Sequence, residues 1–253
     1  MGNTGLVTHF QSEERYAALL TLFPALLFGG VFILWPIVFS LYVSMWDWPL
    51  IGSGQRFIGP ENWARLIADR QFWHALSITV LYSIGSVLTG AVLSLLLALG
   101  LQQDLPGRGW LRTVFYLPII MPSVAAALFW KGMFQPQIGA INVGLRALGL
   151  STPPWLAHPM WALAALMIVR VWRYAGYHMA IFLAGLSRIP QALYEAAQLD
   201  GASVWARFWH VTWPLLRPTT ALVLATSGIF AFQVFGTAYV LTGGGPMGGT
   251  PLC

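Results

Sequence analysis

Long apolar stretches that a water-soluble fold could not hide dominate this 253-residue sequence. An α-helix needs about 20 apolar residues to cross the hydrocarbon core of a bilayer. Charged residues make up 8% of the chain, whereas about 25% is usual in soluble domains. We therefore predict an all-α, polytopic membrane protein that forms a single transmembrane domain over residues 1–253. Its predicted spans, about five in number, cover residues 16–43, 75–101, 113–130, 159–187 and 218–242.

The distribution of Lys and Arg gives the expected orientation. With five spans, Arg15 falls on the same side as loop 102–112, with two arginines, and loop 188–217, with three. The loops on the other side, 45–74 and 131–158, hold five Lys and Arg in all. Cytoplasmic loops of membrane proteins are enriched in Lys and Arg. The count favours a cytoplasmic N-terminus by a narrow margin.

Several chemistries are disfavoured by composition. The net charge of +5 fits membrane topology better than nucleic-acid binding, because the arginines are sparse and lie between apolar runs. A single cysteine, Cys253, excludes a disulfide or a thiolate metal site within the chain. The histidines lack metal-ligand spacing, and no Gly-Lys pair offers a phosphate-binding loop. We predict no catalytic residue, no metal site and no cofactor bound by this chain.

The loop between the fourth and fifth predicted spans, residues 188–217, has a pattern of its own. Pro190 suits the first turn of a helix, and Leu193 and Leu199 give that helix an apolar side. Gly201 suits the left-handed residue that ends a helix. Residues 205–211 predict a second short helix that stops near Pro214. The loop is thus predicted to form a helix-turn-helix at the cytoplasmic face.

This loop resembles the coupling motif of permease subunits of ATP-binding cassette (ABC) importers, in which Glu-Ala-Ala precedes a glycine and, further on, a proline. Val211 and Trp213 replace the usual Ile and Leu of that motif. The resemblance implies that the loop couples to an ATPase through Glu195, Ala196, Ala197, Asp200, Gly201 and Pro214. On the residues alone, the loop could instead be an interfacial helix that only caps the bundle.

Two further stretches resemble the carbohydrate-uptake class of these permeases, which includes maltose and glycerol-phosphate types. They are Phe57-Ile58-Gly59-Pro60-Glu61-Asn62-Trp63 and Leu241-Thr242-Gly243-Gly244-Gly245-Pro246. The resemblance implies a bacterial-type inner-membrane location and a second permease subunit as heterodimer partner. It also implies two ATPase subunits that bind ATP and Mg²⁺, and an extracytoplasmic solute-binding protein. Because the family core has a sixth helix after this point, the chain is expected to be C-terminally truncated.

Polar side chains within the spans are candidates for the transport path. Charges at mid-depth are costly and usually face a bundle interior or a watery cavity. Aromatic faces stack on sugars, and a cation suits a hydroxyl or phosphate group. The candidates are Trp172, Arg173 and Tyr177 in the fourth span and Gln233 in the fifth, with Arg170 left undecided. Structural roles for all of them, as links between helices or as side chains reaching the interface, stay open.

Two other classes of protein compete with an importer subunit. A secondary transporter or channel without an ATPase would show paired broken helices in repeated halves, which the sequence does not display. A membrane-embedded enzyme would need clustered ionisable residues near the spans, and only the fourth predicted span offers any.

Overall fold

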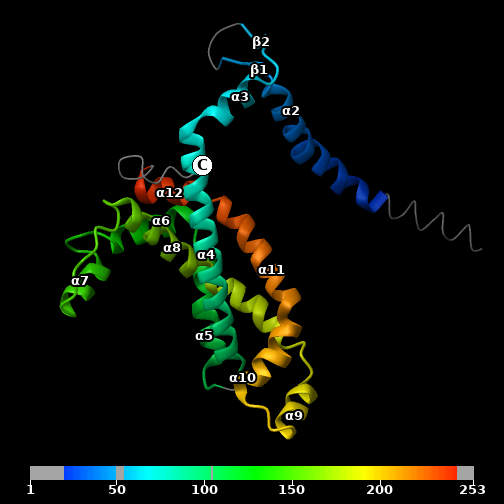
Figure 1. Cartoon of the computed structure of the whole chain (residues 1–253), viewed down its shortest axis with the longest axis vertical. Helices are drawn as coiled ribbons and strands as arrows, with labels where there is room; N and C mark the ends of the chain where they lie inside the picture. Colours follow the sequence, from blue (N-terminus) through cyan, green and yellow to red (C-terminus); the bar gives the residue numbers. More distant parts are fainter. Residues whose placement is uncertain (1–19, 50–53, 104, 244–253) are drawn as a thin grey trace, which may run out of the picture. The chain divides into compact units, whose positions relative to one another are not determined.

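The computed structural model describes residues 20–49, 54–103 and 105–243 (Figure 1). Helices account for most of these residues, and the strands amount to one short antiparallel pair. The all-α prediction is therefore confirmed. The chain divides into two compact units, Met1–Phe72 and Trp73–Cys253, which we describe in turn.

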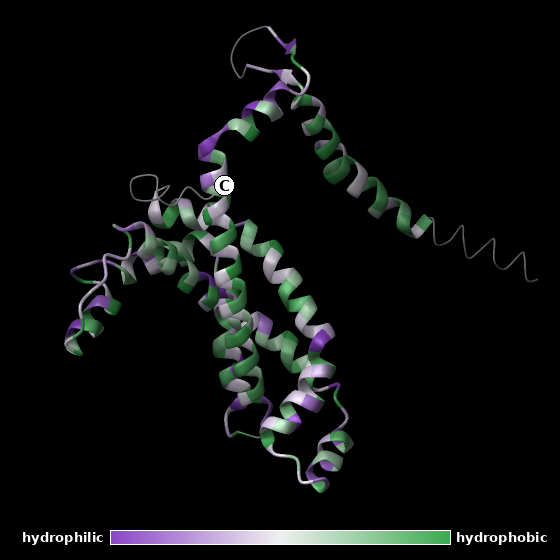
Figure 2. Ribbon diagram, viewed as in Figure 1, coloured by the Kyte–Doolittle hydropathy of each residue, from purple (hydrophilic) through white to green (hydrophobic). Residues whose placement is uncertain are grey.

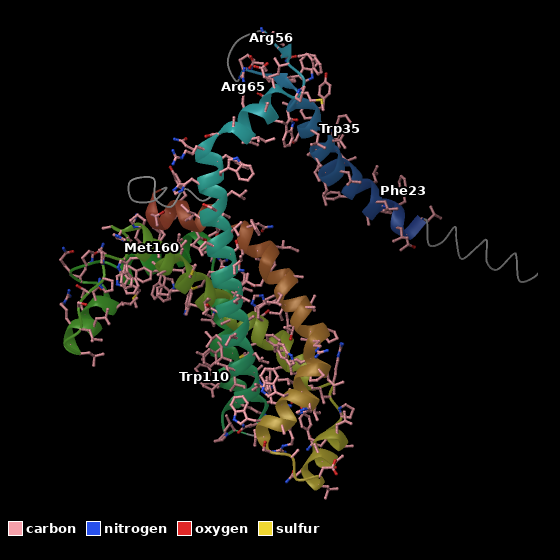
Figure 3. All side chains as sticks on the ribbon, viewed as in Figure 1. Phe23, Trp35, Arg56, Arg65, Trp110 and Met160 are labelled. Carbon is pink, nitrogen blue, oxygen red and sulfur yellow. The ribbon has the colours of Figure 1, made fainter. Side chains whose placement is uncertain are left out.

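In the first unit, one continuous helical stretch runs from Leu20 to Val43 and includes η1 (Gly30–Leu34, a π-helical turn) and α2 (Trp35–Val43). None of the described residues of this stretch is buried. Phe23 and Trp35, labelled in Figure 3, are 60% and 63% exposed. A helix that is apolar on all sides and leaves its side chains uncovered is suited to a hydrocarbon environment rather than to water.

The segment after α2 forms a small hairpin. Strand β1 (Trp46–Asp47) pairs with β2 (Arg56–Phe57), and α3 (Glu61–Ala68) follows. The Asn62 side-chain amide donates to the carbonyl oxygens of Ser44 and Trp46, at 3.0 and 3.1 Å. The Trp63 indole N–H donates to the Ser44 hydroxyl. Through these bonds, Asn62 and Trp63 join the start of α3 to the end of α2.

The second unit contains the remaining helices. They are α4 (Arg70–Gln102, which begins at the end of the first unit), α5 (Arg108–Tyr116), η2 (Leu117–Ile120), α6 (Ser123–Met133), α7 (Ala140–Ala147), α8 (Pro159–Leu186), α9 (Gln191–Leu199), α10 (Val204–Arg207), η3 (Phe208–Thr212), α11 (Trp213–Phe232) and α12 (Phe235–Thr242). Helix α8 lies against α5, α6, α11 and α12, so it is the central element of this unit.

The third predicted span, 113–130, is not one straight helix. Residues Arg108–Ile120 and Ser123–Met133 meet at an angle of 104°. The break falls at Met121, whose backbone is extended (φ −66°, ψ 136°). Met121 precedes Pro122, and a proline disfavours helical geometry in the residue before it. Pro122 therefore divides the predicted span.

The fifth predicted span also differs from expectation. The helix begins earlier, because α10, η3 and α11 form one helical stretch from Val204 to Phe232. The predicted stop near Pro214 is wrong. Pro214 lies inside this continuous stretch, directly after the π-helical turn η3, and does not end the helix. At its far end α11 stops at Phe232, and α12 starts anew at Phe235.

Among the described residues, three helical stretches are long and apolar enough to cross a membrane, or four if the bent pair is one span. The three are Leu20–Val43, Arg70–Gln102 and Val204–Phe232. Helix α8, with 28 residues, is also long enough, but Arg170, Arg173 and His178 lower its apolar character. Figure 2 shows hydrophobic residues along the helices and hydrophilic ones gathered in the hairpin and the connecting loops. The five-span topology stays a prediction.

Two apolar clusters form the core of the second unit, and α8 contributes to both. One cluster includes Tyr82, Leu166 and Val234, and the other includes Ala98, Phe182 and Leu216. Between them lies a layer of buried polar side chains. Its members come from α4, α8 and α11 and are Ser83, Ser86, Arg170, His178 and Ser227.

Helix α5 approaches α8 at Gly176. A Cβ atom at position 176 would collide with the backbone of Phe115 and Tyr116. Only glycine lets the two backbones meet this closely, as small residues do at helix crossings in membranes.

We predict that Gly176→Ala destabilises the protein, because the backbone of α5 would have to shift. Overpacking of this kind costs about 1–3 kcal/mol. The measurement is the thermal unfolding midpoint in detergent. Gly228→Ala on α11 is the matched control, since no atom lies within 4 Å of the added Cβ there and alanine favours helix by about 1 kcal/mol. Equal midpoints for the two variants would contradict the close crossing.

Candidate transport cavity and coupling helix

A polar cavity of about 240 Å³ lies in the second unit, beside both helix breaks. Ser123 follows the break between η2 and α6, and Gln233 and Val234 form the break between α11 and α12. Non-helical backbone at membrane depth is tolerated where protein or a watery cavity covers it. The lining residues are Tyr82, Ser123, Val169, Arg170, Arg173, Tyr174, Phe230, Gln233, Val234, Gly236 and Thr237.

Arg170 is almost fully buried and joins three helices. Its Nε donates to the Ser86 hydroxyl of α4 at 3.0 Å, and its Nη2 donates to the carbonyl and hydroxyl oxygens of Ser227 of α11. The guanidinium carbon also lies 5.3 Å from the centre of the Tyr174 ring. Arg170 therefore has a clear structural role and also contributes to the cavity wall.

Arg173 stands one turn further along α8 and is less covered. Its Nη2 donates to the Met121 carbonyl oxygen at 2.9 Å. This carbonyl belongs to the break before α6, so the arginine satisfies a backbone group that the kink releases from helical bonding. Its Nε is buried and has no hydrogen-bond partner within the described part of the chain. The guanidinium lies 5.6 Å from the Tyr174 ring centre, on the same aromatic side chain as Arg170.

Of the residues predicted for the path, the structure brings Arg173 and Gln233 to the cavity, and Arg170 with them. Trp172 and Tyr177 do not line it. Trp172 packs against Phe129 and Trp130 of α6, at ring-centre distances of 6.1 and 5.4 Å. Tyr177 contacts His178 on its own helix.

Sequence reasoning gave no role to Tyr82 and Ser123, although both line the cavity. Tyr82 is 1% exposed and lies in α4, among mostly apolar residues. A tyrosine in an apolar span gives a weak signal, because tyrosines are common near membrane interfaces. Ser123 lines the cavity because the chain bends just before it.

The predicted coupling loop folds as a largely exposed helix that contacts the core through Tyr194. All nine residues of α9 are exposed or half-exposed, and Leu199 is 90% exposed. Gly201 has φ +73°, so the left-handed residue predicted at this position is confirmed. The N–H groups of Gly201 and Ala202 donate to the carbonyls of Gln198 and Ala197. This pattern is a Schellman motif, which ends a helix sharply.

The turn after α9 leads directly into the long helix of α11. Ser203 caps α10 by accepting from the Ala206 N–H at 3.2 Å. The Tyr194 hydroxyl of α9 and the Thr212 hydroxyl lie 3.1 Å apart. Because α10, η3 and α11 are continuous, α9 is connected by a short turn to a helix that reaches the cavity.

The described residues contain no group of three or more His, Cys, Asp or Glu side chains placed to hold a metal ion. The cavity itself is lined by arginine, hydroxyl and amide groups and carries no carboxylate. Such a site can bind and release a polar solute.

The family model described as "Binding-protein-dependent transport system inner membrane component" matches residues 90–252. A trehalose/maltose transport system permease protein from Thermococcus litoralis is 36% identical over 98% of this chain and 84% of its own length. An sn-glycerol-3-phosphate transport system permease protein from Agrobacterium fabrum is 33% identical over 88% of this chain and 76% of its own length.

A solved structure supports the same assignment. A chain in the crystal structure of a bacterial alginate ABC transporter, in complex with an alginate pentasaccharide-bound periplasmic protein, superimposes with a TM-score of 0.78. The match covers 94% of this chain and 79% of that chain at 25% sequence identity. This chain therefore belongs to the binding-protein-dependent transport system inner membrane components and is a permease subunit of an ABC transporter.

Proposed function

We propose that this subunit lines part of the membrane path for a sugar or sugar-like solute and couples that path to cytoplasmic ATPases through α9. The largely exposed helix α9, which carries Glu195 and is followed by the left-handed Gly201, is the observation that carries the proposal. A helix of a membrane protein that packs this little on its own core is suited to a partner. Its exposed Leu199 and the small residues beside it would enter a groove on that partner.

The names of the relatives support the solute class. They refer to trehalose, maltose and sn-glycerol 3-phosphate, and the structural relative transports alginate. Trehalose and maltose are disaccharides, sn-glycerol 3-phosphate is a phosphorylated polyol, and alginate is an acidic polysaccharide, so all of them carry hydroxyl groups. The cavity offers matching chemistry in Gln233, Thr237 and Ser123, together with the face of Tyr174.

The proposed assembly contains a second permease subunit, two ATPase subunits and an extracytoplasmic solute-binding protein. The periplasmic protein in the alginate transporter complex supports the last of these. ATP and Mg²⁺ would bind to the ATPase subunits. ATP binding would favour one of two arrangements of the helices, and the difference in affinity between the two states would drive the change.

The proposed orientation places α9 and the N-terminus in the cytoplasm. Only this orientation gives α9 access to an ATPase, and the slight excess of Lys and Arg on that side agrees with it. Glu195, Ala196, Ala197, Asp200 and Gly201 would form the contact surface, and Pro214 would lie within the connected helix.

We expect Gly201→Asp to abolish co-purification of the ATPase from detergent-solubilised membranes, because the new side chain would stand on the docking surface. Glu195→Ala is expected to weaken it. Gly149→Asp is the matched control, since Gly149 has the same φ of +73° and equally open surroundings. Both glycine variants should lose similar stability, so only the docking site distinguishes them. Failure of the wild type to bring down an ATPase would favour a transporter that works without one.

Thr237→Trp is expected to lower solute uptake in proteoliposomes at least tenfold, because the indole would fill much of the cavity. Phe235→Trp, two residues away on α12, is the control, since Phe235 is 62% exposed and does not line the cavity. ATPase co-purification should persist in both variants and so exclude a loss of assembly. Uptake by Thr237→Trp at the wild-type rate would place the path elsewhere.

A further inference from the structure

The cavity wall carries two guanidinium groups and no carboxylate. Arg170 and Arg173 both line it, and the helices α4, α5, α6, α8, α11 and α12 contain no Asp or Glu. Every hydrogen-bond acceptor found for these two arginines within the described residues is a hydroxyl or a backbone carbonyl. Each is a neutral group, so this chain's own helices leave both positive charges at the cavity uncompensated.

Two positive charges without a counter-charge lower the stability of the folded protein, so their presence calls for a functional explanation. Burying a cation without a counter-charge in a low-dielectric region is unfavourable even when its N–H groups are bonded. Arg170 is explained in part by its bonds to α4 and α11. Arg173 is not, because one of its five N–H donors holds the Met121 carbonyl and its Nε has no partner in the described part of the chain. A planar guanidinium with spare donors suits a carboxylate, phosphate or sulfonate.

We propose that the cavity is selective for anions, so that the solute passing through it is a sugar or polyol bearing an acidic group rather than a neutral sugar. This inference rests on the proposed function for the site and narrows its substrate class. Arg173 is the solute-binding charge. Arg170, fixed by Ser86 and Ser227, adds to the positive potential behind the Tyr174 ring. Gln233 and Thr237 are left to meet the neutral hydroxyl groups.

The test measures the potential in the cavity directly. In the protein purified from membranes with the subunits that accompany it, Thr237→Cys is combined with Cys253→Ser, which removes the only other thiol of this chain. The thiol is treated with methanethiosulfonate reagents of similar size carrying a sulfonate or a trimethylammonium group, and with the small neutral methyl reagent. Modification of this chain is followed by mass spectrometry. Each rate is divided by that reagent's rate with a free thiol, so that intrinsic reactivity cancels.

We expect the sulfonate reagent to react faster than the cationic one by at least an order of magnitude, as two nearby charges at intermediate dielectric imply. Arg173→Gln should reduce this preference severalfold, and Arg173→Lys should restore it, since lysine keeps the charge. In the Thr237→Cys protein that keeps Arg173, equal normalised rates for the sulfonate and cationic reagents would overturn the proposal. They would mean that another subunit neutralises the arginines. The proposal would also be overturned if even the neutral reagent failed to modify the cysteine at position 237.

This measurement requires neither transport nor ATP hydrolysis. If the anion preference holds while no ATPase co-purifies, the substrate class stands and the coupling proposal fails. If an ATPase co-purifies and the preference is absent, the permease function stands and the solute is neutral.

Discussion

A guanidinium held between helices in an apolar surrounding is the interaction on which the second unit depends. Arg170 bonds Ser86 of α4 and Ser227 of α11 from its place on α8. Apolar packing gives little directional preference between helices in a membrane, because lipid tails are as apolar as leucine. Polar bonds supply that preference, since an unsatisfied donor in hydrocarbon costs several kcal/mol. The bonds of Arg170 specify how α4, α8 and α11 lie relative to one another. The two apolar clusters then pack these helices together.

The need of buried polar groups for hydrogen-bond partners also explains where the cavity lies. A bent chain releases backbone groups that need partners, and Arg173 serves the Met121 carbonyl at one break. The second break, at Gln233, lies on the same cavity. Helix breaks, cations and hydroxyl groups therefore occur together because each makes the others tolerable at membrane depth. A polar solute can use the same donors and acceptors during its passage.

Much of the fold was readable from residues. Long uncharged runs predicted the helices, and Gly201 marked the end of α9 because few residues other than glycine adopt a left-handed conformation at low cost. Two prolines behave in opposite ways. Pro122 breaks a predicted span, whereas Pro214, expected to stop a helix, lies inside one, directly after a π-helical turn. Local sequence does not reveal whether a proline breaks a helix or lies within it, since that depends on the geometry of the turns around it.

The sequence by itself determined the class of protein, most of the helical segments and the glycine after α9, because apolar length and a fixed local spacing are properties of the chain alone. Only the tertiary structure decided which polar side chains share one cavity. Trp172 and Arg173 are neighbours in sequence, yet one packs on α6 and the other lines the cavity. Successive residues on a helix point about 100° apart. Which direction meets a cavity and which meets a neighbour depends on helices far apart in sequence.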